Sequence, residues 1–335
     1  MHGNSGPGCA GRVGGVKMNS DKPDQSDLRS LSGTAWFERI KRLGEELGHF
    51  QRLGLSHSAL FADAGPTLIV TFETVDTIRR GRPDQLPMGL DLARSRGWSS
   101  LTLIAEGQTW YRDPAVYAYF DRLVDDAFFD DFDQVVFYGA GMAGYAAAAY
   151  SVASPGATVV AVQPQATLEP RLAGWDPRWP EMRRTSFTDR YGYAPDMTEG
   201  AGSVFVIYDP EQTMDAMHAA LFARPWTVLL PCRNLGRDIA TALDGMRVLP
   251  SVLTAAATGT LDERLFRTFY RSRRNHAPYL RNLQGKLDAD GRLILSGILC
   301  RNVVQRLRLP KFEQRLTEIE TALKRTGERL PDSIV

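Results

Sequence analysis

The chain has 335 residues, 43% of them hydrophobic, and a formal net charge of +1 at pH 7. This length is enough to bury a sizeable core. A net charge so close to zero gives no overall field that would attract nucleic acid or an anionic membrane, so we expect neither as a partner. Any anion must therefore bind at a local site.

Cysteine and histidine spacing argues against a metal or a disulfide framework. Cys9, Cys232 and Cys300 lie far apart without C-x-x-C spacing, and the five histidines are equally scattered. We therefore predict no metal site and a cytoplasmic location.

Residues 1–32 are rich in glycine, serine and polar residues and contain no apolar stretch long enough for a signal peptide or membrane span. We expect a disordered leader, in which residues 1–17 precede a second possible start at Met18. Residues 33–249 then form the predicted main domain, with a lid insertion at 164–202, and residues 250–335 form a helical extension.

Apolar periodicity in the main domain alternates between helices and strands. Expected helices are 36–47, 88–96, 114–128, 142–152 and 213–222, and expected strands are 56–62, 67–72, 101–105, 134–138, 158–162, 204–208 and 227–230. This order predicts an α/β fold with a doubly wound, mostly parallel sheet. Ligands should bind at the carboxyl ends of its strands.

Two segments outside the strands carry arginines among aromatic residues. In the insertion, Arg183 and Arg184 accompany tryptophans and tyrosines, as expected either of a lid over an anionic ligand or of a surface flap closed by aromatics. In the extension, residues 264–281 place arginines near helical spacing, which suits either a phosphate-binding face or a solvated face. We favour the solvated face, because net basic charge is lacking.

The central stretch is a strand, a glycine-rich turn and a helix of small residues. Gly139, Gly141 and Gly144 match the G-x-G-x-x-G dinucleotide fingerprint, but the next strand runs into Gln163 instead of the acidic residue that binds a ribose. The same turn is also typical of a G-x-S-x-G nucleophile elbow with glycine at the serine position. A third interpretation gives the glycines only a packing role.

The motifs YGAGMAGYAAA and VQPQATLEP resemble α/β-hydrolase-fold-like proteins encoded with bacterial surface-polysaccharide genes, which read YGxSMGGYAAL and SPQxxxDP. The resemblance covers residues 67–242. Some such relatives carry a phosphoadenosine phosphosulfate reductase label. The SGGxDS-type loop and the catalytic-cysteine tail of that chemistry are absent here.

The resemblance implies a catalytic triad that has lost two members. Gly141 stands at the nucleophile position, Asp209 at the acid position and Arg237 at the position of the histidine base. Glycine has no side chain that could attack, and arginine does not accept a proton near neutral pH. Arg237 either offers a positive charge to an anion or pairs with Asp209.

We therefore predict a catalytically degenerate α/β-hydrolase-like protein that needs no cofactor. We expect it to bind an anionic or saccharide-related ligand or a partner. The resemblance implies a role in surface-polysaccharide assembly. The candidate ligand-binding residues are Gly139, Gly141, Met142, Gly144, Glu73 and Arg237. The alternative is an oxidoreductase that holds NAD(P) or FAD at the GAGMAG turn. A further alternative is an enzyme with Glu73, Glu106 or Asp209 as general base.

Overall fold

One eight-stranded sheet organises the protein, for which a computed structural model describes Leu28 and residues 31–331. The strand order is β1-β2-β4-β3-β5-β6-β7-β8. β2 is antiparallel to both β1 and β4, and every other neighbouring pair is parallel. The strands are β1 (Gly48–Leu53), β2 (His57–Ala62), β3 (Thr67–Thr74), β4 (Ser99–Ala105), β5 (Gln134–Ala140), β6 (Thr158–Val162), β7 (Ser203–Tyr208) and β8 (Thr227–Pro231).

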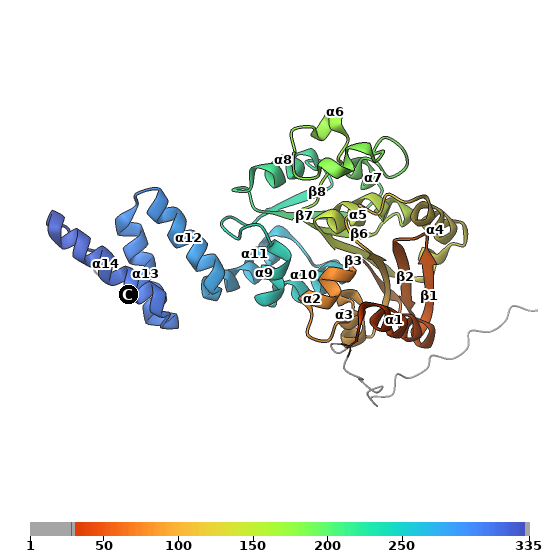
Figure 1. Ribbon diagram of the computed structural model, residues 1–335, viewed down its shortest axis with the longest axis horizontal. Helices are drawn as coiled ribbons and strands as arrows, with labels where there is room; N and C mark the ends of the chain where they lie inside the picture. The colour runs from red at the N-terminus through yellow and green to blue at the C-terminus, as the bar shows by residue number, and fades with distance from the viewer. Residues whose placement is uncertain (1–27, 29–30, 332–335) are drawn as a thin grey trace, which may run out of the picture.

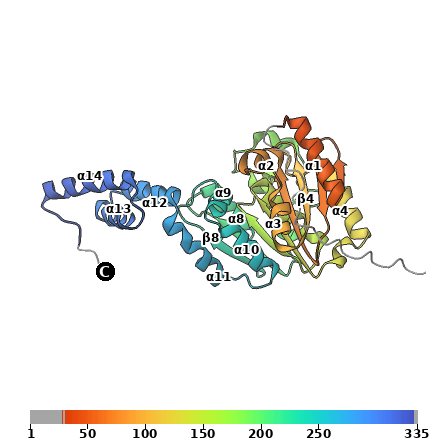
Figure 2. The same cartoon turned by 90° about the horizontal axis from the view of Figure 1, so that it is seen from below.

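Helices cover both faces of this sheet, as Figures 1 and 2 show. Successive residues of β5 pack on opposite faces, Val135 and Phe137 in one core cluster and Val136 and Tyr138 in the other. Such alternation is expected of a strand buried on both sides. The helices of the body are α1 (Gly33–Leu47), α2 (Val75–Gly81), α3 (Met88–Arg96), α4 (Pro114–Asp125), α5 (Met142–Tyr150), α6 (Pro170–Ala173), α7 (Ala194–Met197), α8 (Thr213–Leu221), α9 (Ile239–Gly245), α10 (Val248–Ala257) and α11 (Glu263–Phe269).

The C-terminal part projects from the body as an arm of three helices, α12 (Ala277–Ala289), α13 (Leu293–Leu307) and α14 (Pro310–Thr326) (Figure 1). The arm has a small apolar cluster of its own, which includes Leu280, Cys300, Phe312 and Ile319. None of the helices in residues 31–331 combines the length and the apolar character that crossing a bilayer requires.

The predicted α/β class is confirmed: the sheet is mostly parallel with helices on both faces, and the C-terminal extension is helical. Some predictions within it are wrong. β1 and α2 were not anticipated, and residues 264–281 do not form one helix, because a 3-10 turn at Tyr270–Asn275 separates α11 from α12. Of the predicted leader, residues 1–27, 29 and 30 lie outside the described residues.

Candidate functional site

The turn between β5 and α5 has the geometry of a nucleophile elbow. Gly141 is the N-cap of α5, with φ of 60° and ψ of −125°, a backbone conformation that residues with a Cβ adopt only under strain. Its amide donates to the Val162 carbonyl of β6 (2.9 Å), which fixes the turn against the neighbouring strand. A Cβ built on Gly141 would meet no atom within 4 Å, so the space for a side chain is open.

The other two glycines of the turn are required for close packing. A Cβ on Gly139 would lie 2.0 Å from the Ala143 carbonyl oxygen, and one on Gly144 would lie 3.0 Å from that of Val162. The helix α5 can therefore approach the sheet closely only because these positions lack side chains. The amides of Met142 and Ala143 stand in the first turn of α5, where no intrahelical acceptor exists.

Asp209 follows β7 and is fully buried. Its two carboxylate oxygens accept hydrogen bonds from the amides of Glu211 (3.0 Å) and Gly236 (2.9 Å). The bond to Gly236 ties the end of β7 to the loop that follows β8. Asp209 thus holds the backbone of the loop that carries Arg237.

Arg237 lies on that loop and is exposed. Within residues 31–331 its guanidinium forms no ion pair, so the predicted alternative of a pair with Asp209 is wrong, because Asp209 binds backbone amides instead. The carbonyl of Arg237 accepts a bond from the Gln163 side chain (3.0 Å), and the same side chain accepts from the Ile239 amide (2.9 Å). Gln163, at the end of β6, therefore fixes the loop while the arginine side chain stays free.

An open pocket of about 580 Å³ lies where this loop meets the first helix of the arm. Asp209 and Arg237 line it together, and His276, Pro278 and Asn282 close it from the arm side. Asn282 donates to the Asn234 carbonyl (3.3 Å), which holds the arm against the loop. Burial, followed by the charge of Arg281, lowers the pKa of His276 and so favours its neutral form.

The structure thus separates the predicted site residues into two groups. Arg237 and Asp209 share the pocket, whereas Gly139, Gly141, Met142, Gly144 and Glu73 are not among the residues that line it. Sequence reasoning missed His276 and Asn282 as pocket residues. No sequence signal marks them, since the fold alone brings the arm to the end of β8.

The three acids considered as general bases are each engaged in the structure. Glu73 is buried, and its carboxylate accepts from the amides of Met88 (2.8 Å) and Gly89 (3.0 Å) at the start of α3. Burial raises the pKa of Glu73 despite these bonds. Glu106 pairs with Arg52 at the end of β4. Glu73 therefore anchors the start of α3.

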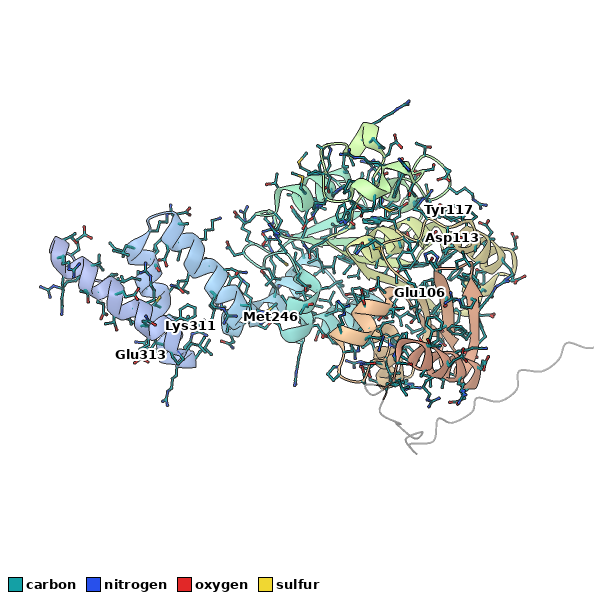
Figure 3. All side chains as sticks on the ribbon, in the orientation of Figure 1. Glu106, Asp113, Tyr117, Met246, Lys311 and Glu313 are labelled. Carbon is teal, nitrogen blue, oxygen red and sulfur yellow. The ribbon has the colours of Figure 1, made fainter. Side chains whose placement is uncertain are left out.

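Other groups that could act as nucleophiles are also occupied. Cys232 is fully buried, and burial raises its pKa far above the usual range, so no thiolate is available. Thr109 Oγ1 lies 2.8 Å from Nε2 of His57, whose Nδ1 lies 3.4 Å from Asp113. However, His57 is only 2% exposed. The Thr109 oxygen also accepts a hydrogen bond from the Tyr111 amide (3.1 Å), and the Asp113 side chain caps the N-terminus of α4. These three residues tie the loop after β4 to the start of β2; Asp113 is labelled in Figure 3.

Arg112 holds the insertion closed over α5. Its side chain is only 1% exposed, and its guanidinium donates to the carbonyls of Ser186 and Arg190 and to the carboxylate of Asp189. It also donates to the hydroxyl of Tyr145 on α5 (3.3 Å). One buried arginine therefore satisfies several acceptors of the insertion at once.

A second polar cluster fixes the insertion to α8. His218 is fully buried; its Nδ1 accepts from the Ala166 amide (3.2 Å), so Nε2 carries the proton and donates to Asp176 (3.0 Å). Arg178 bridges Asp176 and Asp215 (2.7 and 2.6 Å). Burial alone would raise the pKa of Asp176, but the bonds from His218 and Arg178 outweigh it and hold that pKa far below its ordinary value.

The insertion is a packed flap closed by aromatic side chains. Trp179 packs edge-on against Trp110, with ring centroids 5.0 Å apart, and Tyr191 packs against Tyr150 at 4.5 Å. Arg183 and Arg184 are exposed. Of the two interpretations of the insertion, these contacts favour the flap closed by aromatics.

The dinucleotide alternative is not supported by the placement of the turn. A Rossmann fingerprint normally follows the first strand of its βαβ unit, whereas this turn follows the fifth strand of the chain. Gln163, at the position expected to bind a ribose, instead donates to Asp215 (2.7 Å) and binds the loop after β8. The nucleophile-elbow conformation of Gly141 explains the turn without a bound pyrophosphate.

Comparisons with known proteins find distant structural neighbours only. No protein-family model matches the chain, and no curated protein does. Among solved structures, it is similar to the carboxylesterase EstE1 from a metagenomic library (14% identity, TM-score 0.41, covering 69% of this chain and all of that one). It is also similar to an esterase of Pyrobaculum calidifontis, with 13% identity, a TM-score of 0.41 and coverage of 70% of this chain and 95% of that one. A third neighbour is the bacterial brefeldin A esterase, with 14% identity, a TM-score of 0.37 and coverage of 65% of this chain and 74% of that one. Scores this low carry no conclusion about activity.

Proposed function

We propose that this protein is a non-hydrolytic member of the α/β-hydrolase-like proteins, which binds a small anionic ligand in the pocket of Arg237 and has lost the nucleophile at Gly141. The observation that carries the proposal is the elbow at Gly141, which keeps the backbone angles of a nucleophile turn without any side chain. Glycine removes the attacking group, and the strain of the turn is relieved at the same time.

We expect the anion to bind Arg237, the cationic side chain among the residues that line the pocket, whose acids are Asp209, Glu211 and Asp238. The Arg237 guanidinium is exposed and forms no ion pair within the described part of the chain, and His276 lies on the arm side of the same pocket. Asp209 holds the loop by backbone bonds and so keeps the arginine in place. An arginine fork suits phosphate, sulfate or carboxylate groups. The resemblance to proteins of surface-polysaccharide loci adds sugar phosphates and sugar nucleotides to the ligands worth testing.

Arg237→Ala should abolish the stabilisation of the protein by such an anion. At about one hundred times its Kd, a bound anion stabilises the folded state by about 2.7 kcal/mol, which corresponds to a rise in Tm of roughly 5 °C. We expect this rise for the wild type with inorganic phosphate, glucose 1-phosphate or a sugar nucleotide, measured by differential scanning fluorimetry. The Arg237→Ala variant should keep its Tm without ligand, because the side chain is exposed.

Arg264→Ala is the matched control, since Arg264 is an exposed arginine of α11 that forms no ion pair within residues 31–331 and does not line the pocket. This variant should respond to the anion as the wild type does. An equal rise in Tm for all three proteins would reveal a general salt effect and refute a site at Arg237.

A further inference from the structure

The arm carries more basic than acidic side chains. Residues 277–326 contain ten Lys and Arg against five Asp and Glu. Three of the acids pair with cations of the arm: Asp288 and Glu318 with Arg315, and Glu320 with Arg301. The exposed cations of the arm that form no ion pair within residues 31–331 are Arg281, Arg292, Arg306, Arg308, Lys311, Lys324 and Arg325. Of these, Arg306 donates hydrogen bonds to the side chains of Asn275 and Asn302.

The same arm exposes apolar side chains to solvent. Ile294, Leu295 and Ile298 of α13 are 40%, 45% and 41% exposed, although their helix is packed against α14 on its other side. Large exposed apolar residues that cluster and are bordered by charge are typical of a binding surface.

A complementary surface follows α4 on the body. Asp125, Asp126, Asp130 and Asp131 are exposed, and none of their carboxylates forms an ion pair or hydrogen bond within residues 31–331. Asp133 extends the same run. Val124, 49% exposed, adds an apolar side chain beside them. We call Val124 and these five aspartates the acidic patch.

The arm and the acidic patch cannot neutralise each other within one molecule. In both views the arm lies at one end of the protein, and α4, which leads into the patch, lies on the far side of the body (Figures 1 and 2). Lys311 is labelled on the arm in Figure 3, distant from Asp113 and Tyr117 near the start of α4. The arm and the acidic patch can therefore meet each other only between two molecules.

We propose that the protein associates head to tail, with the arm of one copy docked on the acidic patch of a second copy. The second copy is identified by charge complementarity, because the chain carries both the basic arm and the acidic patch. Each surface has exposed charged side chains that form no ion pair within residues 31–331, and each includes exposed apolar side chains. Such a heterologous contact uses different surfaces on the two partners, so it produces rings or open chains of molecules. Opposite charges also speed the encounter and set the register.

Paired charge reversals test this contact in the full-length protein. One variant carries Asp125, Asp126, Asp130 and Asp131→Lys, and the other carries Arg292, Arg308, Lys311, Lys324 and Arg325→Glu. Sedimentation velocity at about 50 mM salt should show species larger than the monomer for the wild type, and these should dissociate near 0.5 M salt, where charges are strongly screened. Each variant alone should be monomeric, with a circular dichroism spectrum like that of the wild type.

Mixing the two variants should restore association, because each then meets an opposite charge on the other. Leu295→Ser should weaken assembly of the wild type, whereas Leu55→Ser, at a 90% exposed apolar residue outside both surfaces, should not. Monomeric wild type at low salt, or a mixture that stays monomeric, would overturn the proposal. Retention of the wild type, but not of the arm variant, on an immobilised polyanion with no self-association would assign the arm to an anionic polymer instead.

Discussion

Gly139→Ala should destabilise the protein by at least about 3 kcal/mol, whereas Gly141→Ala should cost only about 1 kcal/mol. The added Cβ at Gly139 would lie 2.0 Å from the Ala143 carbonyl oxygen and 2.8 Å from the Gly144 amide, so α5 must move away from the sheet. At Gly141 the methyl group meets open space, and only the backbone strain remains. Thermal unfolding should show a fall in Tm above about 6 °C for the first variant and of about 2 °C for the second.

The pair of variants separates steric requirement from strain at the same turn. Similar losses at the two positions would mean that the turn does not have the elbow geometry, because crowding is expected at Gly139 only. A stabilised Gly141→Ala would also contradict it, since alanine gains stability only where the native φ suits it.

Arg112→Ala should loosen the insertion and cost about 3–5 kcal/mol, the range for breaking a buried charge network. The change removes the donors for the Ser186 and Arg190 carbonyls and leaves Asp189 without its partner. Limited proteolysis should then cut residues 164–202 much faster than in the wild type. Hydrogen exchange of this segment should rise in parallel, while that of β5 follows the overall stability.

Arg190→Ala is the control for this second prediction. Arg190 belongs to the same segment and pairs with Asp121, but its side chain is 61% exposed, so its loss should cost less than about 1 kcal/mol. Protection of the insertion that survives Arg112→Ala would show that the His218 and Asp176 cluster holds the segment by itself.

The sequence predicted those parts of the fold whose signals are local. β6 and α3 were predicted with their observed bounds, because an apolar run or an amphipathic period is set within a few residues. β1 was missed because it begins at Gly48, directly after α1 ends at Leu47, and no group of turn-forming residues marks the boundary in the sequence. The prediction of one long basic helix over residues 264–281 was wrong. The 3-10 turn at Tyr270–Asn275 separates two helices there, but it does not interrupt the spacing of the arginines in the sequence.

The candidate site was less predictable because its contacts join distant segments. The pattern around Gly141 predicted the elbow, whose angles depend on the adjacent strand and helix alone. Nothing in the sequence indicated that Asp209 binds the Gly236 amide, that Glu73 anchors α3, or that His276 reaches the loop of Arg237. Charge and polarity at these residues are compatible with several partners, and only the packing of the elements selects one.

The central claim, a hydrolase-like elbow without hydrolysis, is tested most directly by ester turnover of the purified wild type. The assay measures p-nitrophenol release from p-nitrophenyl acetate and butyrate, with Gly141→Ala and Arg237→Ala as paired variants. We expect the wild type to release p-nitrophenol no faster than the two variants or an inert protein at equal concentration, because Gly141 offers no nucleophile. Saturable turnover by the wild type that Arg237→Ala abolishes would contradict the account.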